Sequence, residues 1–434
     1  MNKWWVPAVV VLAGIVVVAG LALHKPHSPL SGEVADDPAL VQRGRYLAAA
    51  GDCASCHTVS DASPYAGGLA MPVPLVGTIH TPNITPDAQT GIGTWSLAAF
   101  DRAVRYGIRK DGKNLYPAMP YVSYAKVDDE DIKALYAYFK YGVRAVSQVN
   151  PAPSAAWPMT MRWPLQLWNV AFFDGSRYQI KSGHDAQWNR GAYLAQGLAH
   201  CGTCHTPRGI GFQQVALDET GSGYLSGALL GKWEAYNITS DSNAGIGSWS
   251  PEQLREYLAT GNVPGVAQAA GPMAEAVAHS FSQMNRDDMA ALAAYVKTTP
   301  PVSTGTPHPR QAQGTPSDVV AGLRGVSFND ATAKPARIFL GACASCHHWT
   351  GAGTRDGYYP SLFHNSTVGA PNPNNLAQVI LHGLHRKTAS QDIRMPAFGS
   401  TLSDKEVAAL VNFLTGQFGA NAAQMTEEGV SKLR

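Results

Sequence analysis

Apolar and polar residues follow a helical period in several short segments of this 434-residue chain. In the segment 127–139, Ile132, Leu135, Tyr136 and Phe139 fall at positions i, i+3, i+4 and i+7, and acidic residues occupy the first turn. This pattern predicts an amphipathic helix whose acidic start suits the helix dipole. The same reasoning predicts further helices over residues 41–47 (beginning near Asp37-Pro38), 97–106, 286–296, 335–340 and 402–413.

The N-terminus carries one uncharged apolar run from Trp4 to Leu23. Its 20 residues would span about 30 Å as a helix, which matches the hydrocarbon core of a bilayer. A secretory signal usually has a shorter apolar core, although Val17-Val18-Ala19 and Gly20-Leu21-Ala22 offer weak cleavage sites. We therefore expect residues 1–30 to form a membrane anchor or a signal, with a retained transmembrane helix favoured.

An internal repeat follows. Asn237-Ile238-Thr239 repeats Asn83-Ile84-Thr85, and Gly245–Ser250 repeats Gly91–Ser96, both at an offset of 154 residues. A repeat of this length predicts a duplicated structural unit.

Two proline-rich segments separate the predicted units. Residues 150–181 combine prolines with tryptophans and cannot form one continuous helix. This bridge is either a strap packed on its neighbours or a docking surface for a partner subunit or a membrane. Five prolines between Thr299 and Ser317 predict a stiff, extended linker. The predicted order is therefore an N-terminal segment 1–30, domain 31–149, bridge 150–181, domain 182–298, linker 299–325 and domain 326–434.

Composition narrows the class of partner. The formal charge is only +2, and no run of Lys or Arg stands out, so we expect no nucleic-acid partner. Charged residues make up 15% of the chain, which also contains 43 glycines and 29 prolines. Such a composition is typical of small domains with long loops.

Every cysteine of the chain lies in a C-x-x-C-H motif, the attachment motif of c-type haem. Two thiols reach the two vinyl groups of the porphyrin, and the adjacent histidine binds the iron. A zinc knuckle or a redox C-x-x-C is the alternative, but zinc needs four ligands, usually from two separated pairs. The motifs predict three covalently attached haems c on the following residues: Cys53, Cys56 and His57; Cys201, Cys204 and His205; Cys343, Cys346 and His347.

Each iron also needs a sixth ligand, for which the repeat suggests methionine. Met119 and Met273 are separated by the repeat offset of 154, and Met395 precedes the last predicted helix by a similar interval. A methionine opposite histidine raises the reduction potential, as electron transfer requires. Met289 is expected to be a core residue. The competing candidates are Met71 and Met284, which lack a repeat partner, and four histidines for the third iron: His348, His364, His382 and His385. Of these, His348 directly follows His347 and cannot reach the opposite face of the haem.

Together these patterns predict an all-α protein, with three class I cytochrome c domains in tandem and an N-terminal transmembrane or signal helix. Covalent haem attachment in bacteria takes place outside the cytoplasm, so we expect the body of the protein there. We expect electron relay and no substrate chemistry, because no Gly-rich nucleotide loop or Ser/His/Asp set is evident. A multihaem peroxidase, or a cytochrome serving a terminal oxidase, remains the alternative.

The order of motifs resembles the three-haem cytochrome c subunit of bacterial membrane-bound alcohol, aldehyde, gluconate and fructose dehydrogenases. The resemblance rests on the segments 51–53, 65–68, 83–87, 116–121, 158–164 and 204–209 and on the closing Leu433-Arg434. It implies electron transfer from a catalytic dehydrogenase subunit (a quinoprotein, flavoprotein or molybdenum enzyme) to membrane ubiquinone. It also implies a location at the inner membrane, on the periplasmic side. The long apolar start departs from relatives with a cleaved signal and is more like cytochromes that partner molybdenum-containing aldehyde oxidoreductases.

Overall fold

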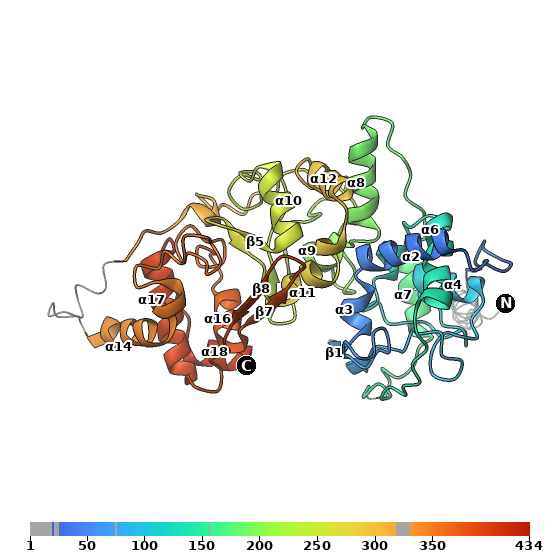
Figure 1. Ribbon diagram of the computed structural model, residues 1–434, viewed down its shortest axis with the longest axis horizontal. Coiled ribbons are helices and arrows are strands. Elements are labelled where there is room, and N and C mark those ends of the chain that lie inside the picture. Colours follow the sequence, from blue (N-terminus) through green and yellow to red (C-terminus); the bar gives the residue numbers. More distant parts are fainter. Residues whose placement is uncertain (1–19, 21–25, 74–75, 156, 318–329) are drawn as a thin grey trace, which may run out of the picture. The chain divides into compact units, whose positions relative to one another are not determined.

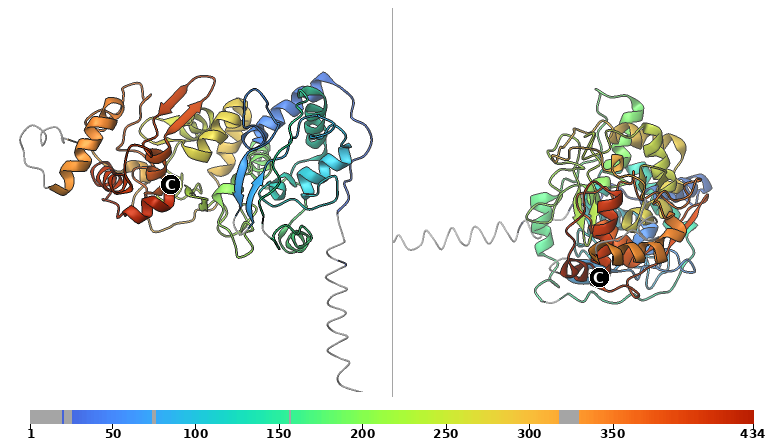
Figure 2. Two further views of the ribbon diagram at one scale, coloured as in Figure 1. Left: turned by 90° about the horizontal axis from the view of Figure 1, so that it is seen from below. Right: turned by 90° about the vertical axis from the view of Figure 1, so that its left-hand side faces the viewer.

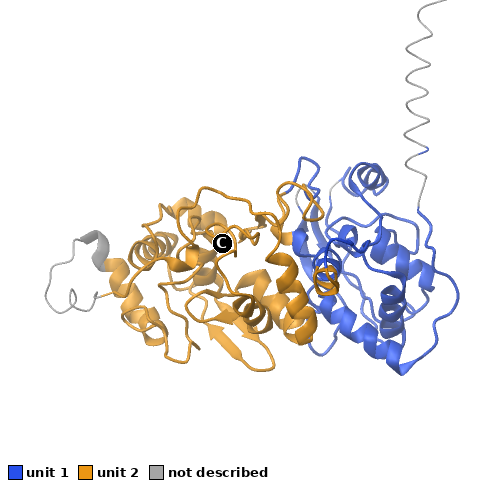
Figure 3. Cartoon of the chain, turned by 90° about the horizontal axis from the view of Figure 1, so that it is seen from above, with its two compact units in different colours: residues 1–184, 192–203, 208–214 blue, residues 185–191, 204–207, 215–434 orange. Residues whose placement is uncertain are grey.

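The computed structural model describes Gly20 and residues 26–73, 76–155, 157–317 and 330–434. The chain forms two compact units, which Figure 3 colours separately. Unit 1 takes the described parts of residues 1–184 with 192–203 and 208–214, and unit 2 takes 185–191, 204–207 and the described parts of 215–434. The division into three cytochrome domains remains a prediction from the sequence.

Three helices of the first repeat begin at side-chain caps. Asp37 accepts a hydrogen bond from the Ala39 amide, and Ser96 and Asp128 cap the next two long helices in the same way. Figure 1 shows their course through unit 1. The elements are α2 (Pro38–Ala50), α3 (Cys53–His57), α4 (Leu97–Tyr106), α5 (Tyr121–Tyr124), α6 (Asp129–Ala137), the π-helix η1 (Tyr138–Gly142) and α7 (Pro164–Phe172).

The first helix of this repeat crosses its last long helix at a glycine. A Cβ at Gly44 of α2 would lie 1.9 Å from the Ala134 oxygen of α6, so only glycine permits this approach. The second repeat contains the same crossing, where a Cβ at Gly191 would lie 1.9 Å from the Ala291 oxygen. The helices concerned are α8 (Ala186–Gln196) and α12 (Arg286–Val296).

An ion pair beside each glycine repeats as well. Arg43 pairs with Asp131 at 2.5 Å, and Arg190 pairs with Asp288 at 2.7 Å. The first and last long helices therefore pack in the same way in the two repeats. In both, the arginine directly precedes the glycine in the sequence.

The rest of the second repeat and the third haem-motif segment lie mainly in unit 2. Ser403 and Glu406 form the predicted capping box, although the helix they begin runs to Phe418, five residues beyond the predicted end. Further elements are α9 (Cys201–His205), α10 (Pro251–Thr260), α11 (Gly271–His279), η2 (Phe281–Gln283), η3 (Arg310–Ala312), α14 (Asp330–Ile338), η4 (Phe339–Cys343), α15 (Ala344–His347), α16 (Asn374–His382), α17 (Asp404–Phe418) and α18 (Glu427–Leu433).

The all-α prediction is wrong, because the described residues include four antiparallel two-stranded hairpins. Their strands have two to four residues, too few for the alternating pattern that predicts a strand. Each hairpin pairs backbone groups within a loop between helices. The pairs are β1 (Ala70–Val73) with β2 (Gly77–His80), β3 (Ala228–Leu230) with β4 (Trp233–Ala235), β5 (Asn262–Val263) with β6 (Ala267–Gln268), and β7 (Leu384–Lys387) with β8 (Asp392–Met395). Figure 2 shows β1–β2 in blue and β7–β8 in orange.

The predicted transmembrane helix is not supported. Trp4–Leu23 lies outside the described residues except for Gly20. Within the described part of the chain, no helix combines the length and the apolar character needed to cross a membrane.

Candidate haem sites

The histidine of each C-x-x-C-H motif is fixed by a backbone carbonyl. This carbonyl accepts a hydrogen bond from Nδ1, which leaves the Nε2 lone pair free to bind a metal. The distances are 2.8 Å from His57 to the Pro82 oxygen, 2.7 Å from His205 to the Tyr236 oxygen and 2.9 Å from His347 to the Pro360 oxygen. The three sites therefore share one histidine orientation, although the carbonyl comes from a different residue type in the second.

Burial keeps these imidazoles neutral. It lowers the pKa of His57, His205 and His347, and in each case the hydrogen bond to the carbonyl only partly opposes this effect. A metal-binding imidazole must be neutral, so the environment suits the predicted role.

A glycine after each motif also holds the backbone of the histidine. We call the carbonyl that binds the imidazole and this glycine together the histidine clamp. The glycine amide donates to the histidine carbonyl oxygen, at 2.8 Å for Gly67 and His57, 2.7 Å for Gly227 and His205, and 2.8 Å for Gly353 and His347. All three glycines have positive φ, with values of 73°, 98° and 67°. Sequence reasoning did not assign this role, because the glycine follows its histidine by 10, 22 and 6 residues, a spacing with no constant period.

The six cysteines are half-buried thiols at the positions the motif requires. Cys53 and Cys56 are three residues apart on the short helix α3, so both point from one side of it. Burial raises the pKa of Cys53 to about 12 and that of Cys343 to about 11, with nearby thiol and carboxylate charges contributing at Cys53. Cys53 and Cys343 are thus uncharged thiols at neutral pH.

The predicted methionine ligands lie in three different kinds of element. Met119 is in the turn before α5, Met273 is in the first turn of α11, and Met395 ends β8. All three are half-buried, and their role as sixth ligands stays a prediction. Met289 is buried on α12, as expected of a core residue. Among the alternative ligands, His385 bonds Asp392 through Nε2 at 3.0 Å.

Buried donors in unit 2 fit a haem with its propionates. Trp249 Nε1 and Arg310 Nε are buried without a hydrogen-bond partner in the described part of the chain. The Arg310 guanidinium lies 4.5 Å from the centroid of the Tyr236 ring, the residue whose carbonyl holds His205. Carboxylate oxygens are the acceptors such donors need. By contrast, no group of three or more His, Cys, Asp or Glu gathers among the described residues as a zinc site would require.

Carbonyl-bound histidines in C-x-x-C-H helices define a c-type cytochrome. The family model described as "Cytochrome c" matches residues 41–142 and 189–300. The model described as "Cytochrome C oxidase, cbb3-type, subunit III" matches residues 330–414.

Full-length relatives make the assignment more specific. The chain is 42% identical to the gluconate 2-dehydrogenase cytochrome c subunit of Pantoea cypripedii, over 93% of this chain and 91% of that protein. It is 41% identical to the fructose dehydrogenase cytochrome subunit of Gluconobacter japonicus, over 91% and 82%. It is 40% identical to the cytochrome c subunit of alcohol dehydrogenase (quinone) of Gluconacetobacter polyoxogenes, over 92% and 85%. The chain belongs to this family of dehydrogenase cytochrome c subunits, which transfer electrons through covalently bound haem c.

Proposed function

We propose that this protein carries electrons through three haems c from a catalytic dehydrogenase subunit to ubiquinone, on the periplasmic side of the inner membrane. The observation that carries the proposal is the repeated histidine clamp, which gives His57, His205 and His347 the same orientation and neutral state. A chain that builds this clamp three times supports three haems. The dehydrogenase partner is supported by relatives that are cytochrome subunits of gluconate, fructose and alcohol dehydrogenases.

The chain's own groups have simple roles in this function. The bound haem supplies a one-electron iron couple. The histidine clamp would hold His57, His205 and His347 in a fixed orientation for binding iron, which would limit rearrangement when the iron changes charge. Met119, Met273 and Met395 would supply the second protein ligand of each iron, and a thioether ligand would favour the reduced state.

Haem number is tested first. The holoprotein, matured in a bacterium that attaches c-type haem, should show the mass of three haems by intact mass spectrometry. His57→Ala, His205→Ala and His347→Ala should each abolish the low-spin spectrum of one haem. A mass corresponding to fewer than three haems would contradict the proposal.

The methionine ligands are tested by redox titration. Met119→His, Met273→His and Met395→His should each lower the potential of one haem, because histidine stabilises the oxidised iron. Met71→His is the matched control, since Met71 is also half-buried but lies on β1 without a repeat partner. A methionine whose replacement leaves all potentials unchanged would be removed from the assignment.

Donor and acceptor are tested with the native complex. We expect a dehydrogenase subunit to co-purify with the protein, and the complex to reduce a water-soluble ubiquinone analogue when the dehydrogenase substrate is added. The acceptor part rests on the relatives described as alcohol dehydrogenase (quinone). A complex that reduces the haems but not the quinone would contradict it.

A cytochrome that serves a terminal oxidase is the second candidate. It is favoured by the oxidase-subunit family model that matches residues 330–414. This match covers only the third segment, whereas the dehydrogenase relatives match more than nine-tenths of the chain. Co-purification of an oxidase in place of a dehydrogenase would favour it.

A further inference from the structure

Arg386 is a buried cation that the third haem-motif segment inserts into the second repeat. It lies on β7 and is 1% exposed. Its Nη1 donates to the Ala269 oxygen at 2.7 Å. Its side chain also packs against the backbone of Gly261, where an added Cβ would lie 2.7 Å from both Cδ and Nε. Glycine at the end of α10 is therefore what leaves room for this guanidinium.

No carboxylate of the described residues forms an ion pair with Arg386, where Tyr257 is the one titratable group acting on its charge, and its buried Nε has no hydrogen-bond partner there. An arginine stays protonated in a protein, and a buried charge is costly unless an opposite charge compensates it. The geometry thus calls for an anion that the folded polypeptide does not supply.

A second buried arginine faces the same region. Arg310, 7% exposed, donates to the Ala244 oxygen, and its own Nε is also without a partner. The positive charges of both guanidinium groups act on Tyr257. Burial raises the pKa of Tyr257 to about 12, while the charges of Arg386 and Arg310 oppose this rise. The ring of Trp249, whose Nε1 is also unpartnered, lies 5.4 Å from the ring of Tyr257.

These donors lie around the second of the three histidine clamps. Arg310 stacks on Tyr236, whose carbonyl oxygen is 2.7 Å from His205 Nδ1. A haem bound through His205 carries two propionates, which are anions with acceptor oxygens. The buried Arg386 guanidinium and the Trp249 indole donor match that chemistry. Arg310 contributes its unpartnered Nε, although the Glu234 carboxylate also acts on its charge.

We propose that Arg386 binds a propionate of the haem held by His205, together with Arg310, so that the third segment completes the haem site of the second repeat. The inference rests on the proposed haem at this motif. No equivalent of Tyr257 exists in the first repeat, where the 154-residue offset leads to Ala103. The first haem therefore lacks this tyrosine, and the proposed contact concerns the haem held by His205.

A fixed cation beside a haem favours the reduced iron, because reduction removes one positive charge from its neighbourhood. Burial limits screening of this effect by salt. Arg386→Gln should lower the reduction potential of one haem by at least about 59 mV. This corresponds to a tenfold change in the equilibrium constant for its one-electron reduction. Arg310→Gln should lower the same potential, and the other two haems should change little.

Spectroelectrochemical titration of the full-length holoprotein tests this. Lys387→Gln is the matched control, because Lys387 is the next residue on β7, carries the same charge and is exposed. Intact mass spectrometry of each variant reports haem number, so that failure of the three-haem proposal is seen separately from failure of this one.

Three results would overturn the inference: unchanged potentials in Arg386→Gln, an equal shift in Lys387→Gln, or a shift of different haems by Arg386→Gln and Arg310→Gln. If the Arg386→Gln protein does not accumulate in the cell, the Arg386→Lys variant is titrated in its place. It keeps the charge but loses the planar fork, so a smaller lowering of the same potential supports the proposal and an unchanged potential overturns it.

Discussion

The imidazole of His57 and its own backbone carbonyl are both held by main-chain groups of one loop. Pro82 accepts from the ring, and the Gly67 amide donates to the His57 carbonyl. The two contacts depend on each other, since a Cβ at Gly67 would lie 2.4 Å from the oxygens of both Thr81 and Pro82. The orientation of the His57 imidazole therefore depends on a glycine that contacts only the backbone beside it.

Replacing Gly67 with alanine should disrupt the first haem site. The new Cβ would displace the Pro82 carbonyl, and the positive φ of 73° adds strain. We expect a loss of about 3 kcal/mol in the free energy of unfolding. Haem content by haemochrome assay and melting followed in the Soret band measure the effect.

Gly32→Ala is the control for that substitution. Its φ is 87°, but no atom lies within 4 Å of the added Cβ, so it carries the backbone strain without the collision and should cost about 1 kcal/mol. Equal losses in the two variants would show that the clamp is not what Gly67 supports.

Sequence predicted the side chains of these sites better than their backbone partners. Thioether attachment demands a fixed spacing of Cys, Cys and His, so the motifs could be recognised without a fold. The carbonyl acceptors lie 25, 31 and 13 residues after their histidines. A backbone oxygen has no side-chain signature, and such variable separations give no motif to recognise.

At the scale of elements, helices were predicted well where caps and period agreed. α4 and α12 have the predicted bounds. α17 runs past its predicted end because Leu414 and Phe418 continue its buried face. The hairpins were missed, since strands of two to four residues are formed by loop pairing and have no periodic pattern of their own.

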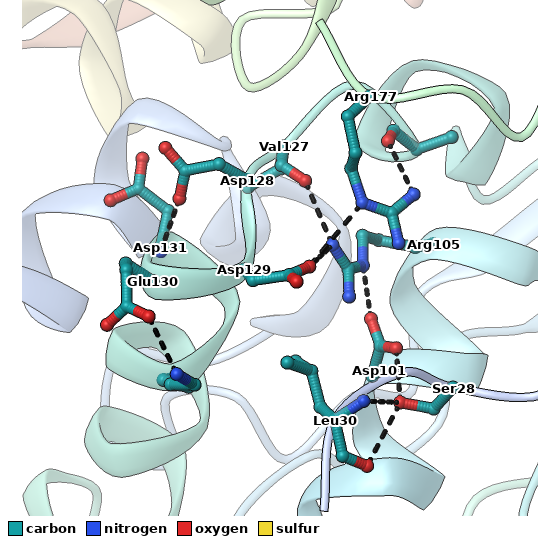
Figure 4. Close-up of polar contacts among 12 residues, drawn as sticks. Ser28, Leu30, Asp101, Arg105, Val127, Asp128, Asp129, Glu130, Asp131 and Arg177 are labelled. Carbon is teal, nitrogen blue, oxygen red and sulfur yellow. Dashed lines mark hydrogen bonds and ion pairs between the residues drawn. The ribbon is translucent and has the colours of Figure 1, made fainter.

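A buried ion network joins the elements of unit 1 (Figure 4). Arg105 of α4 is fully buried and pairs with Asp101 on the same helix and with Asp129 at the start of α6, the latter at 2.5 Å. Ser28 donates to Asp101 at 2.5 Å, which fixes the chain before α2 to the same network. The network therefore connects three segments through one guanidinium.

This network makes the stability of unit 1 sensitive to acid. Burial opposes ionisation of Asp129, but Arg105 and then Arg177 more than offset it and hold its pKa below the ordinary value of 3.8. A carboxyl with a depressed folded pKa stabilises the fold above its unfolded pKa, and this contribution is lost as the pH falls through the folded value. We therefore expect the melting temperature of unit 1 to decrease when the pH is lowered below about 4.

Asp129→Asn should make that acid-induced fall less steep, as measured by thermal unfolding across the acid range. Glu130→Gln is the matched control, because Glu130 neighbours Asp129 but forms an exposed pair with Lys133. If both variants follow the wild-type profile, Asp129 is not the titrating group.

At the scale of the whole chain, unit 2 joins two haem-motif segments through buried polar contacts. Asn375 exchanges two hydrogen bonds of 2.8 Å with the backbone of Glu234. Asn365 donates to Gln268 at 2.7 Å, and the Ser366 amide donates to the Val266 oxygen at 3.0 Å. A buried polar group that loses its hydrogen-bond partner destabilises the fold, so we expect the two segments to unfold together.

Phe418→Ala tests this coupling. Phe418 is fully buried at the end of α17, with its ring centroid 5.5 Å from that of Phe339, and its removal should cost about 3–5 kcal/mol. We expect hydrogen exchange to rise in α17 and also in residues 228–235 and 262–269, whose backbones contact the third segment. Lys405→Ala, an exposed change on the same helix, should leave both regions protected. A rise confined to residues 330–434 would mean that the third segment opens alone and that its contacts with the second do not make one cooperative unit.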